Sequence, residues 1–193
     1  MTQMSDRSST IRYLSHPQVR IAPDVPVPDW GLSDVGLART QAFALAPVLR
    51  ATRRIVSSAE RKAMETARCI ADGLGLTVEI REAMHENDRS ATGFLPPPEF
   101  EKMADAFFAA PDESVRGWER ARDAQARILA EVEAVLASPS GGDVLFVGHG
   151  GVGTLLLCHL LATPIARRHD QQGGGGNVFA FDAETRIMHH PWR

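Results

Sequence analysis

The sequence is poor in cysteine and has no long hydrophobic run. Its two cysteines, Cys69 and Cys158, lie in apolar segments and do not have the spacing of metal ligands. We therefore expect two buried free thiols, as in a reducing compartment, rather than a disulfide. Because no segment is long and apolar enough to span a membrane and the N-terminus has no apolar leader segment, the sequence predicts a cytoplasmic protein without a membrane partner.

The sequence also has no excess of charge of one sign. Its 193 residues include 21 Lys and Arg against 24 Asp and Glu, a net charge of -3, which disfavours non-specific binding to nucleic acid. No group of His, Cys, Asp and Glu has the spacing of metal ligands, so neither a metal nor another cofactor is expected. The hydrophobic content of 44% is typical of a folded domain, and the length is that of a single one.

Short apolar segments alternate with amphipathic ones along the chain. Strands are expected at residues 10–15, 55–57, 77–80, 144–147 and 177–181. Helices are expected from Ser33–Asp34 to near Pro47, from Ser58 to Gly73, over 113–137, and directly after 148–151. This alternation predicts a single α/β domain with a mostly parallel sheet that has helices on both faces.

Three further segments do not fit this alternation. Residues 1–9 are expected to be a loose lead-in, which leaves residues 10–193 as the domain. The segment at about 86–111 is interrupted by glycine and by three consecutive prolines, and is expected to be an excursion outside the layers that caps a site. The four glycines 173–176 have no P-loop context and are expected to form a flexible loop before the last strand.

Two histidines directly follow predicted strands. His16 follows the first strand, and His149 follows the strand at 144–147. Because the carboxyl ends of parallel strands line the ligand crevice of such a sheet, the two imidazoles are expected to meet there. A helix N-terminus after each histidine would also direct backbone N–H groups towards an anion. The sequence therefore predicts an anion-binding site around the two histidines.

Further motifs accompany the histidines in a fixed order. They are Tyr13–Pro17, Leu32–Gly36, the Ser-Ser-x-x-x-basic-Ala-x-x-Thr-Ala motif of Ser57–Ala67, the acid that ends Met84–Glu86, and the Gly-His-Gly-Gly motif within Val144–Leu156. In this order they resemble the histidine phosphatase superfamily, the phosphoglycerate mutase-like proteins, over most of the chain.

The resemblance implies a role for three residues. His16 would attack phosphorus and become phosphohistidine, and His149 would help to hold the phosphoryl group. Glu86 would protonate the leaving oxygen and then activate water. A neutral imidazole is a competent nucleophile, and we expect partial desolvation to raise the pKa of Glu86 so that it serves both steps.

The sequence departs from the family at its phosphate-binding arginines. The motif Arg-His-Gly is Ser15-His16-Pro17 here, and the second arginine falls on Lys62, with Arg61 beside it. A hydroxyl in place of a guanidinium removes both charge and bidentate geometry. Other cations are candidates to replace it, and the full set expected to bind phosphate is Ser15, Lys62, Arg61, Arg20, Arg89 and Gly150. Arg120 is expected to be a solvated surface residue.

These features predict a phosphatase that acts on a small phosphomonoester. The alternatives are a protein that binds a phosphorylated ligand without turning it over and, less favoured at this length, a phosphoglycerate-type mutase. A guanidinium in the space vacated at Ser15 would favour catalysis, whereas an open or apolar gap would favour the binding protein.

Overall fold

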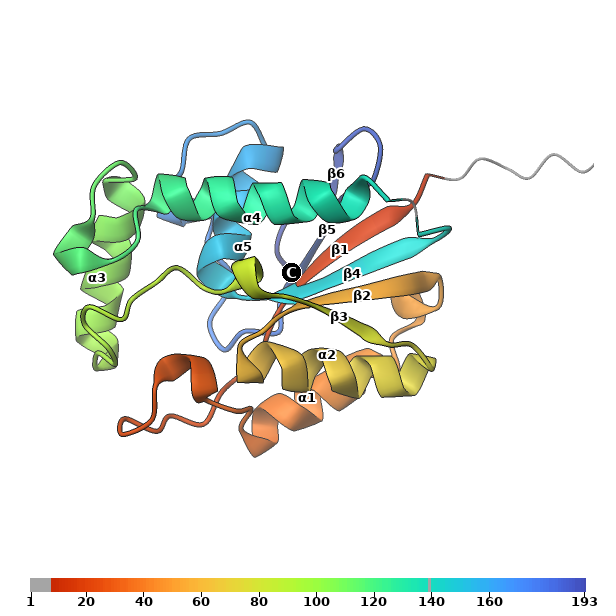
Figure 1. Ribbon diagram of the computed structural model, residues 1–193, viewed down its shortest axis with the longest axis horizontal. Helices are drawn as coiled ribbons and strands as arrows, with labels where there is room; N and C mark the ends of the chain where they lie inside the picture. Colours follow the sequence, from red (N-terminus) through yellow and green to blue (C-terminus); the bar gives the residue numbers. More distant parts are fainter. Residues whose placement is uncertain (1–7, 139) are drawn as a thin grey trace, which may run out of the picture.

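A six-stranded sheet forms the centre of the molecule (Figure 1). The computed structural model describes residues 8–138 and 140–193, so most of the predicted lead-in, residues 1–9, lies outside the described residues. The strand order is β3-β2-β4-β1-β5-β6, with parallel pairing from β3 to β1 and antiparallel pairing of β5 and β6. The strands are β1 (Thr10–Ser15), β2 (Thr52–Ser58), β3 (Val78–Arg81), β4 (Asp143–Gly148), β5 (Val178–Asp182) and β6 (Met188–His190).

Helices cover both faces of this sheet, as Figure 1 shows, and the predicted α/β fold is confirmed. One face carries α1 (Asp34–Ala44) and α2 (Arg61–Leu74), and the other carries α4 (Ala121–Leu136) and α5 (Gly150–Leu160). Short 3-10 turns join the elements: η1 (Val27–Asp29), η2 (Pro47–Leu49), η3 (Glu82–Met84), η4 (Val115–Gly117) and η5 (Arg167–His169). Within residues 8–138 and 140–193, no helix is long and apolar enough to cross a membrane.

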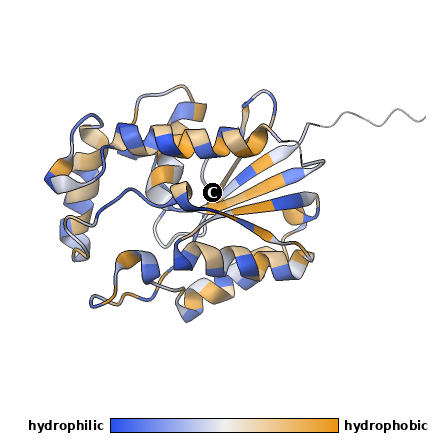
Figure 2. Ribbon diagram, viewed as in Figure 1, coloured by the Kyte–Doolittle hydropathy of each residue, from blue (hydrophilic) through white to orange (hydrophobic). Residues whose placement is uncertain are grey.

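The strand β4 lies between two apolar clusters. Its side chains alternate in direction, so that Phe146 packs with Ile128 of α4 on one face, while Leu145 packs with Ile70 of α2 on the other. Figure 2 shows the resulting concentration of hydrophobic residues along the central strands. A strand buried on both faces reads as a continuous apolar run, which is why this element is recognisable from the sequence.

The excursion at 86–111 contains a helix that the sequence analysis does not predict. This helix, α3 (Pro97–Ala109), begins within the three consecutive prolines. Proline suits the first positions of a helix, because its missing N–H has no partner there and its φ is already helical. The prolines therefore start an element here instead of interrupting one.

Other departures concern boundaries and burial. Helix α2 begins at Arg61 rather than Ser58, and α4 begins at Ala121 rather than at residue 113. Both cysteines are free thiols, but only Cys158 is buried, because Cys69 lies on the half-buried side of α2.

Helix α1 packs against the preceding arm through its smallest residue. Ser33 caps the helix by accepting a hydrogen bond from the Gly36 N–H at 3.0 Å. Gly36 is buried, and a Cβ added to it would overlap the carbonyl oxygen of Gln18. Because Gln18 lies two residues after His16, this close approach positions the segment that follows the first predicted site histidine.

We predict opposite effects of two Gly→Ala substitutions in helices. Gly36→Ala forces the backbone at Gln18 to move and should destabilise the fold by about 1–3 kcal/mol. Gly73→Ala in α2 meets only the Cβ of Ala44 at 3.8 Å, an ordinary contact, and should stabilise the fold by about 0.5–1 kcal/mol. Urea unfolding midpoints of the two variants check this, and equal shifts would contradict the close approach at Gly36.

Candidate active site

The parallel pairing of β1 with β4 brings the two predicted histidines together. Ser15 pairs with Gly148 in the register, so the next residue of each strand, His16 and His149, lies at the same edge of the sheet. Their ring centroids are 5.3 Å apart with planes at 71°. The two imidazoles therefore meet at the carboxyl ends of the strands, as predicted from the sequence.

His16 presents one ring nitrogen for chemistry. Its Nδ1 lies 2.8 Å from the carbonyl oxygen of Pro17, which can only accept, so Nδ1 carries the proton and Nε2 the lone pair. Burial and the neighbouring His149 lower the pKa of His16 to about 3, which keeps the imidazole neutral. The ring lines a cavity of about 400 Å³ between the sheet edge and α3. A neutral imidazole with a free Nε2 at a cavity is suited to nucleophilic attack.

His149 is fully buried behind this cavity. Its Nε2 lies 2.8 Å from the Ser58 hydroxyl and 3.5 Å from Oε1 of Glu60. Its Nδ1 has no hydrogen-bond partner among the described residues. Burial lowers the pKa of His149 despite the two nearby carboxylates, Glu60 and Glu86. A buried, unpartnered ring nitrogen next to His16 is available to a ligand.

Glu86 caps the helix that follows His149. Its carboxylate accepts hydrogen bonds from the N–H groups of Gly151 at 3.1 Å and Val152 at 2.9 Å, at the N-terminus of α5. Burial raises the pKa of Glu86, but His149, Arg89 and the Gly151 N–H outweigh it, so the pKa lies below its ordinary value. The sequence-based expectation of a raised pKa is therefore wrong for the unliganded protein, because the helix N-terminus stabilises the carboxylate.

The segment that carries Glu86 is held from behind by α4. Arg127 donates to the carbonyl oxygens of Ala83 at 2.7 Å and His85 at 2.9 Å, and it pairs with Glu119. Glu119 in turn accepts from the Asp88 N–H at 3.0 Å. The polar segment after Glu86 is therefore both a well-anchored turn and a wall of the cavity.

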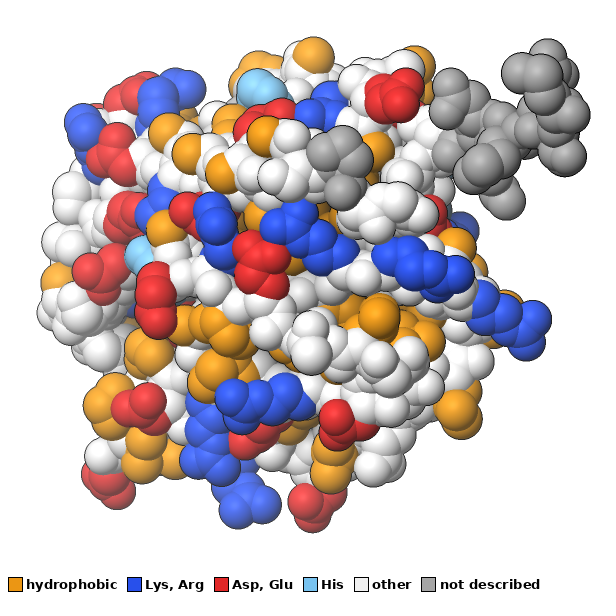
Figure 3. Space-filling view, turned by 45° about the vertical axis from the view of Figure 1, so that its right-hand side comes forward, with side chains coloured by type: hydrophobic (Ala, Val, Ile, Leu, Met, Phe, Trp, Pro, Cys, Tyr) orange, Lys and Arg blue, Asp and Glu red, His pale blue; other side chains and the backbone are white. Residues whose placement is uncertain are grey.

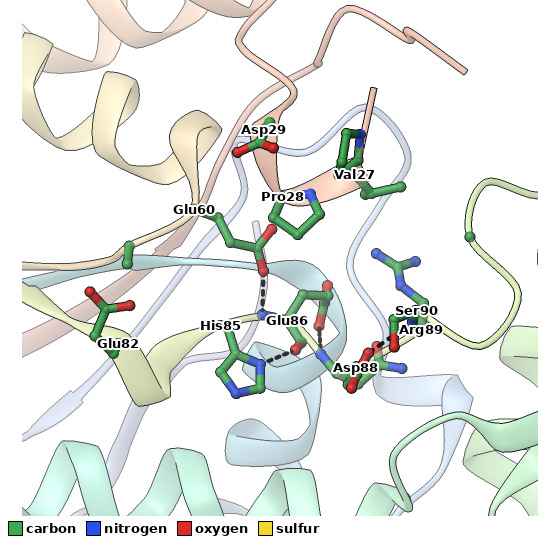
Figure 4. A pocket seen from close by; sticks show the side chains of 14 residues that line it. Val27, Pro28, Asp29, Glu60, Glu82, His85, Glu86, Asp88, Arg89 and Ser90 are labelled. Carbon is green, nitrogen blue, oxygen red and sulfur yellow. Dashed lines mark hydrogen bonds between the residues drawn. The ribbon is translucent and has the colours of Figure 1, made fainter. Parts of the chain in front are cut away.

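Lys62 is buried in an ion pair that sequence reasoning did not include. Its ammonium donates to Glu60 and to the carbonyl oxygen of Val27, the latter at 2.8 Å. Glu60 also accepts from the Glu86 N–H at 2.8 Å (Figure 4). Although burial raises the pKa of Glu60, the charges of His149 and Lys62 lower it to about 2. The predicted phosphate ligand Lys62 thus neutralises a carboxylate and a loop carbonyl, and no sequence motif marked Glu60 as its partner.

The candidate arginines are distributed over different parts of the molecule. Arg20 and Arg61 line a separate pocket of about 180 Å³ and pair with acids there, so the structure does not bring them to His16. Arg120 pairs with Asp123 on the surface, as expected for a solvated residue. Arg89 lines the cavity of His16, with its guanidinium 5.1 Å from the ring of Phe100. Of the predicted arginines, Arg89 is the one at the site.

An amide lies beside Ser15, where the family has its first arginine. The Ser15 hydroxyl donates to Oε1 of Gln171, and a Cβ added to Gly150 would overlap Nε2 of the same amide. Neither the guanidinium nor the apolar gap considered from the sequence is found. Gln171 carried no recognisable signal, because it lies 155 residues from the histidine it approaches; only the fold makes them neighbours.

Two of the four glycines at 173–176 pack against the backbone of the first histidine. The Gly176 N–H donates to the carbonyl oxygen of His16 at 3.2 Å, and Gly175 pairs with Pro17. Gly175 has φ +65°, and a Cβ there would overlap the same carbonyl oxygen. Gly175 is needed for this close approach, and the segment 173–176 is a loop before the strand β5, as predicted.

A second cavity adjoins the first on the opposite side of Glu86. It has a volume of about 630 Å³ and is shown in Figure 4. Glu86, Asn87 and Arg89 line both cavities. The loop that carries η1 forms the outer wall of this second cavity. The volume of the cavity leaves room beside Glu86 for a substituent larger than a phosphoryl group.

We predict that Glu60 and Lys62 stabilise the fold only as a pair. Because a pKa of about 2 is below the ordinary 4.5, the contribution of Glu60 is present above about pH 4.5 and is lost as the pH falls towards 2. It amounts to about 3 kcal/mol, so Glu60→Gln and Lys62→Met should each destabilise by about that much. The double variant should lose less stability than the sum of the two single losses. Glu60→Gln should also lack the decrease in stability between about pH 4.5 and pH 2.

The more exposed pair between Arg54 and Glu79 provides the matched control. Glu79→Gln should cost less than about 1 kcal/mol. Urea unfolding at several pH values measures all four variants. Additive effects of Glu60→Gln and Lys62→Met would contradict the coupling.

Comparison with known proteins agrees with this geometry. The profile of the histidine phosphatase superfamily (branch 1) matches residues 23–188. A solved mycobacterial glucosyl-3-phosphoglycerate phosphatase is 24% identical over 96% of each chain with a TM-score of 0.76. Its complex with inorganic phosphate has the same identity and TM-score over 96% of this chain and 95% of that one.

A second solved relative is the Bacillus stearothermophilus protein YhfR. It is 23% identical over 94% of this chain and 95% of its own, with a TM-score of 0.76. No curated protein matches the chain significantly. Since the family profile covers most of its length, the chain belongs to the histidine phosphatase superfamily, branch 1.

Proposed function

We propose that this protein is a phosphatase that hydrolyses a small phosphomonoester through phosphohistidine on His16. One observation carries the proposal: the free Nε2 of a neutral His16 and the carboxylate of Glu86 line the same cavity. A nucleophile and a proton donor on one cavity serve bond cleavage, whereas binding alone requires neither. The superfamily, the phosphatase relatives and the phosphate complex of one of them support the same conclusion.

The reaction proceeds in two steps, and Glu86 gives up a proton in the first and takes one up in the second. In the first, Nε2 of His16 forms a bond to phosphorus, the bond from phosphorus to the ester oxygen breaks, and protonated Glu86 gives its proton to that oxygen. In the second, ionised Glu86 takes a proton from water, and the water oxygen attacks phosphorus. The N–P bond breaks, which releases inorganic phosphate and restores both His16 and protonated Glu86.

The surroundings of the cavity suit this chemistry. The guanidinium of Arg89 is a donor for phosphoryl oxygens, and the unpartnered Nδ1 of buried His149 serves as one in the tautomer that carries its proton there. Phe107, Phe108 and Trp118 line the side towards α3 and limit the access of water. A bound phosphoryl group brings negative charge near Glu86 and raises its pKa, which opposes the lowering in the unliganded protein.

The second candidate is a protein that holds a phosphorylated ligand without turnover. The observation in its favour is the Ser15 position, where an amide and not a guanidinium is found, together with a Lys62 already paired to Glu60. Loss of a positioned donor typically costs about 2.7–4 kcal/mol of transition-state stabilisation. Mutase activity is the third candidate and requires retention of an intermediate between transfers.

We predict that phosphoryl transfer depends on His16 and stalls without Glu86. With 4-nitrophenyl phosphate, whose leaving group needs little protonation, Glu86→Gln should release one equivalent of nitrophenolate and accumulate acid-labile phosphoprotein. His16→Ala should show neither, and its turnover should fall at least about 10³-fold. Quenched-flow measurement with a phosphoprotein assay checks both. His159→Ala, on an exposed position of α5, is the control.

Two outcomes would contradict the proposal in different ways. Undiminished turnover in His16→Ala would exclude phosphohistidine at this residue. Absence of turnover in every protein, with phosphate binding retained, would favour the second candidate.

The shifted pKa values predict an acidic optimum for kcat/KM. His16, with its pKa near 3, is neutral above about pH 3, whereas the lowered pKa of Glu86 leaves it protonated only at acid pH. For an alkyl phosphate, whose poor leaving group must be protonated, the first step needs neutral His16 and protonated Glu86. The kcat/KM for such an ester should therefore fall about tenfold per unit as the pH rises above the pKa of Glu86. Dividing the kcat/KM of the wild type by that of Glu86→Gln at each pH removes the effect of substrate ionisation, which is common to both proteins. A ratio that does not vary with pH would contradict the role of Glu86.

A further inference from the structure

The amide of Gln171 has a fixed orientation at the site. The Nδ2 group of Asn177 donates to Oε1 of Gln171 at 3.1 Å and to the carbonyl oxygen of Gln172 at 3.0 Å. Ser15 donates to the same Oε1. Because both neighbours donate, the amide atom that they contact must be the oxygen, Oε1. The nitrogen, Nε2, is then the atom that lies towards Gly150 at the start of α5.

This places a neutral donor between the nucleophile and the helix. Gln171, His16 and Gly150 line the same cavity of about 400 Å³. Among the described residues, the hydrogen bonds of the Gln171 amide all use Oε1, which leaves both Nε2 protons to a ligand. The amide thus lies beside the position of the missing arginine and donates without adding charge.

A second amide points to a ligand in the same place. Asn87 is only 6% exposed and lines both cavities, yet its Nδ2 has no partner among the described residues. Its Oδ1 lies close to Gly151, next to the carboxylate of Glu86. An unpartnered buried donor costs free energy unless a ligand satisfies it. The Nδ1 of His149 is a further buried polar atom without a partner among the described residues.

The charged groups of the cavity leave no positive excess. Its described lining contains two cations, Arg89 and Arg167, against three acids, Glu86, Glu101 and Asp170. Arg167 already pairs with Glu101 and Asp105, and Lys62 with Glu60. Figure 3 shows a different face of the molecule, where acidic and basic side chains lie side by side over much of the surface and several basic ones form a row towards the right. A doubly charged phosphate would enter a site with nothing left to neutralise its second charge.

From these observations we infer that the site binds a phosphate ester carrying a single negative charge, held by the neutral amides of Gln171 and Asn87. This rests on the proposed phosphatase function and names the form of its substrate. A guanidinium binds two charged oxygens at once, whereas an amide binds one oxygen and requires no charge on it. A singly protonated monoester and a diester share this chemistry, and the cavity of about 630 Å³ beside Glu86 has room for an ester substituent.

Binding of two anions of the same shape tests the inference at a pH where Glu86 is ionised and cannot protonate a methoxide leaving group. At about pH 8, methyl phosphate carries two charges and methyl sulfate one. Titration calorimetry should give wild-type dissociation constants for the two within about tenfold of each other. Gln171→Met, which keeps the shape and removes the donor, should weaken both by similar factors.

Placing a cation at the same position should restore preference for the dianion. Gln171→Lys is expected to tighten methyl phosphate at least about tenfold more than methyl sulfate, because the added charge acts at contact distance. Gln41→Lys, on an exposed position of α1, adds the same charge elsewhere and should leave the ratio unchanged. Asn87→Leu is the second variant and should weaken both anions.

The outcomes separate this inference from the proposed function. Wild-type preference for methyl phosphate above about 100-fold, or no effect of Gln171→Met and Asn87→Leu, would overturn the inference even if turnover requires His16. The expected binding without His16-dependent turnover would overturn the function and leave the inference. Turnover of methyl 4-nitrophenyl phosphate identifies a diester substrate. If only 4-nitrophenyl phosphate is turned over, and its turnover increases as the pH falls through the second ionisation of this ester, the substrate is the singly protonated monoester.

Discussion

The parallel register between β1 and β4 is the constraint on which the site depends. Ser15 opposite Gly148 makes His16 and His149 neighbours, although 133 positions separate them along the chain. Tyr13, the only tyrosine of the sequence, reinforces this arrangement: its hydroxyl lies 3.1 Å from the His149 N–H and 3.3 Å from the His149 carbonyl. A shift of one residue in this register would turn the side chains of the shifted strand to the other face, and the two imidazoles would no longer meet.

A chain of charged and polar groups connects the rest of the site to this register. Glu60 pairs with Lys62, approaches His149 and accepts from the Glu86 N–H, and Glu86 in turn caps α5. Each group partly neutralises its neighbour, which offsets part of the cost of burying these charges. Lys62 lies at the position that the resemblance assigns to a phosphate-binding arginine, but its ammonium already donates to two acceptors, Glu60 and the carbonyl oxygen of Val27. It therefore stabilises the interior of the protein and not a bound phosphate.

The parts of the molecule with strong local patterns were accessible from the sequence. The buried run of β4, the glycine that ends α2 and the serine that caps α1 each have a local physical cause, and so do the two strand-end histidines. The start of α3 was missed because prolines signal both the interruption of one helix and the beginning of another. The partners of Ser15 and Lys62 were missed for a different reason. Gln171 and Glu60 have no motif, and their roles arise from distances in space that only the sheet determines.

The lowered pKa of Glu86 is compatible with its proposed role as an acid if the substrate provides the missing shift. In the unliganded protein the N-terminus of α5 and the charges of His149 and Arg89 favour the carboxylate. A phosphoryl group beside it contributes negative charge, which raises the pKa of a neighbouring acid. The same group can attract Arg89, whose charge lowers the pKa of Glu86, away from the carboxylate. Proton uptake by Glu86 is then linked to substrate binding, and the acid becomes competent when there is a leaving oxygen to protonate.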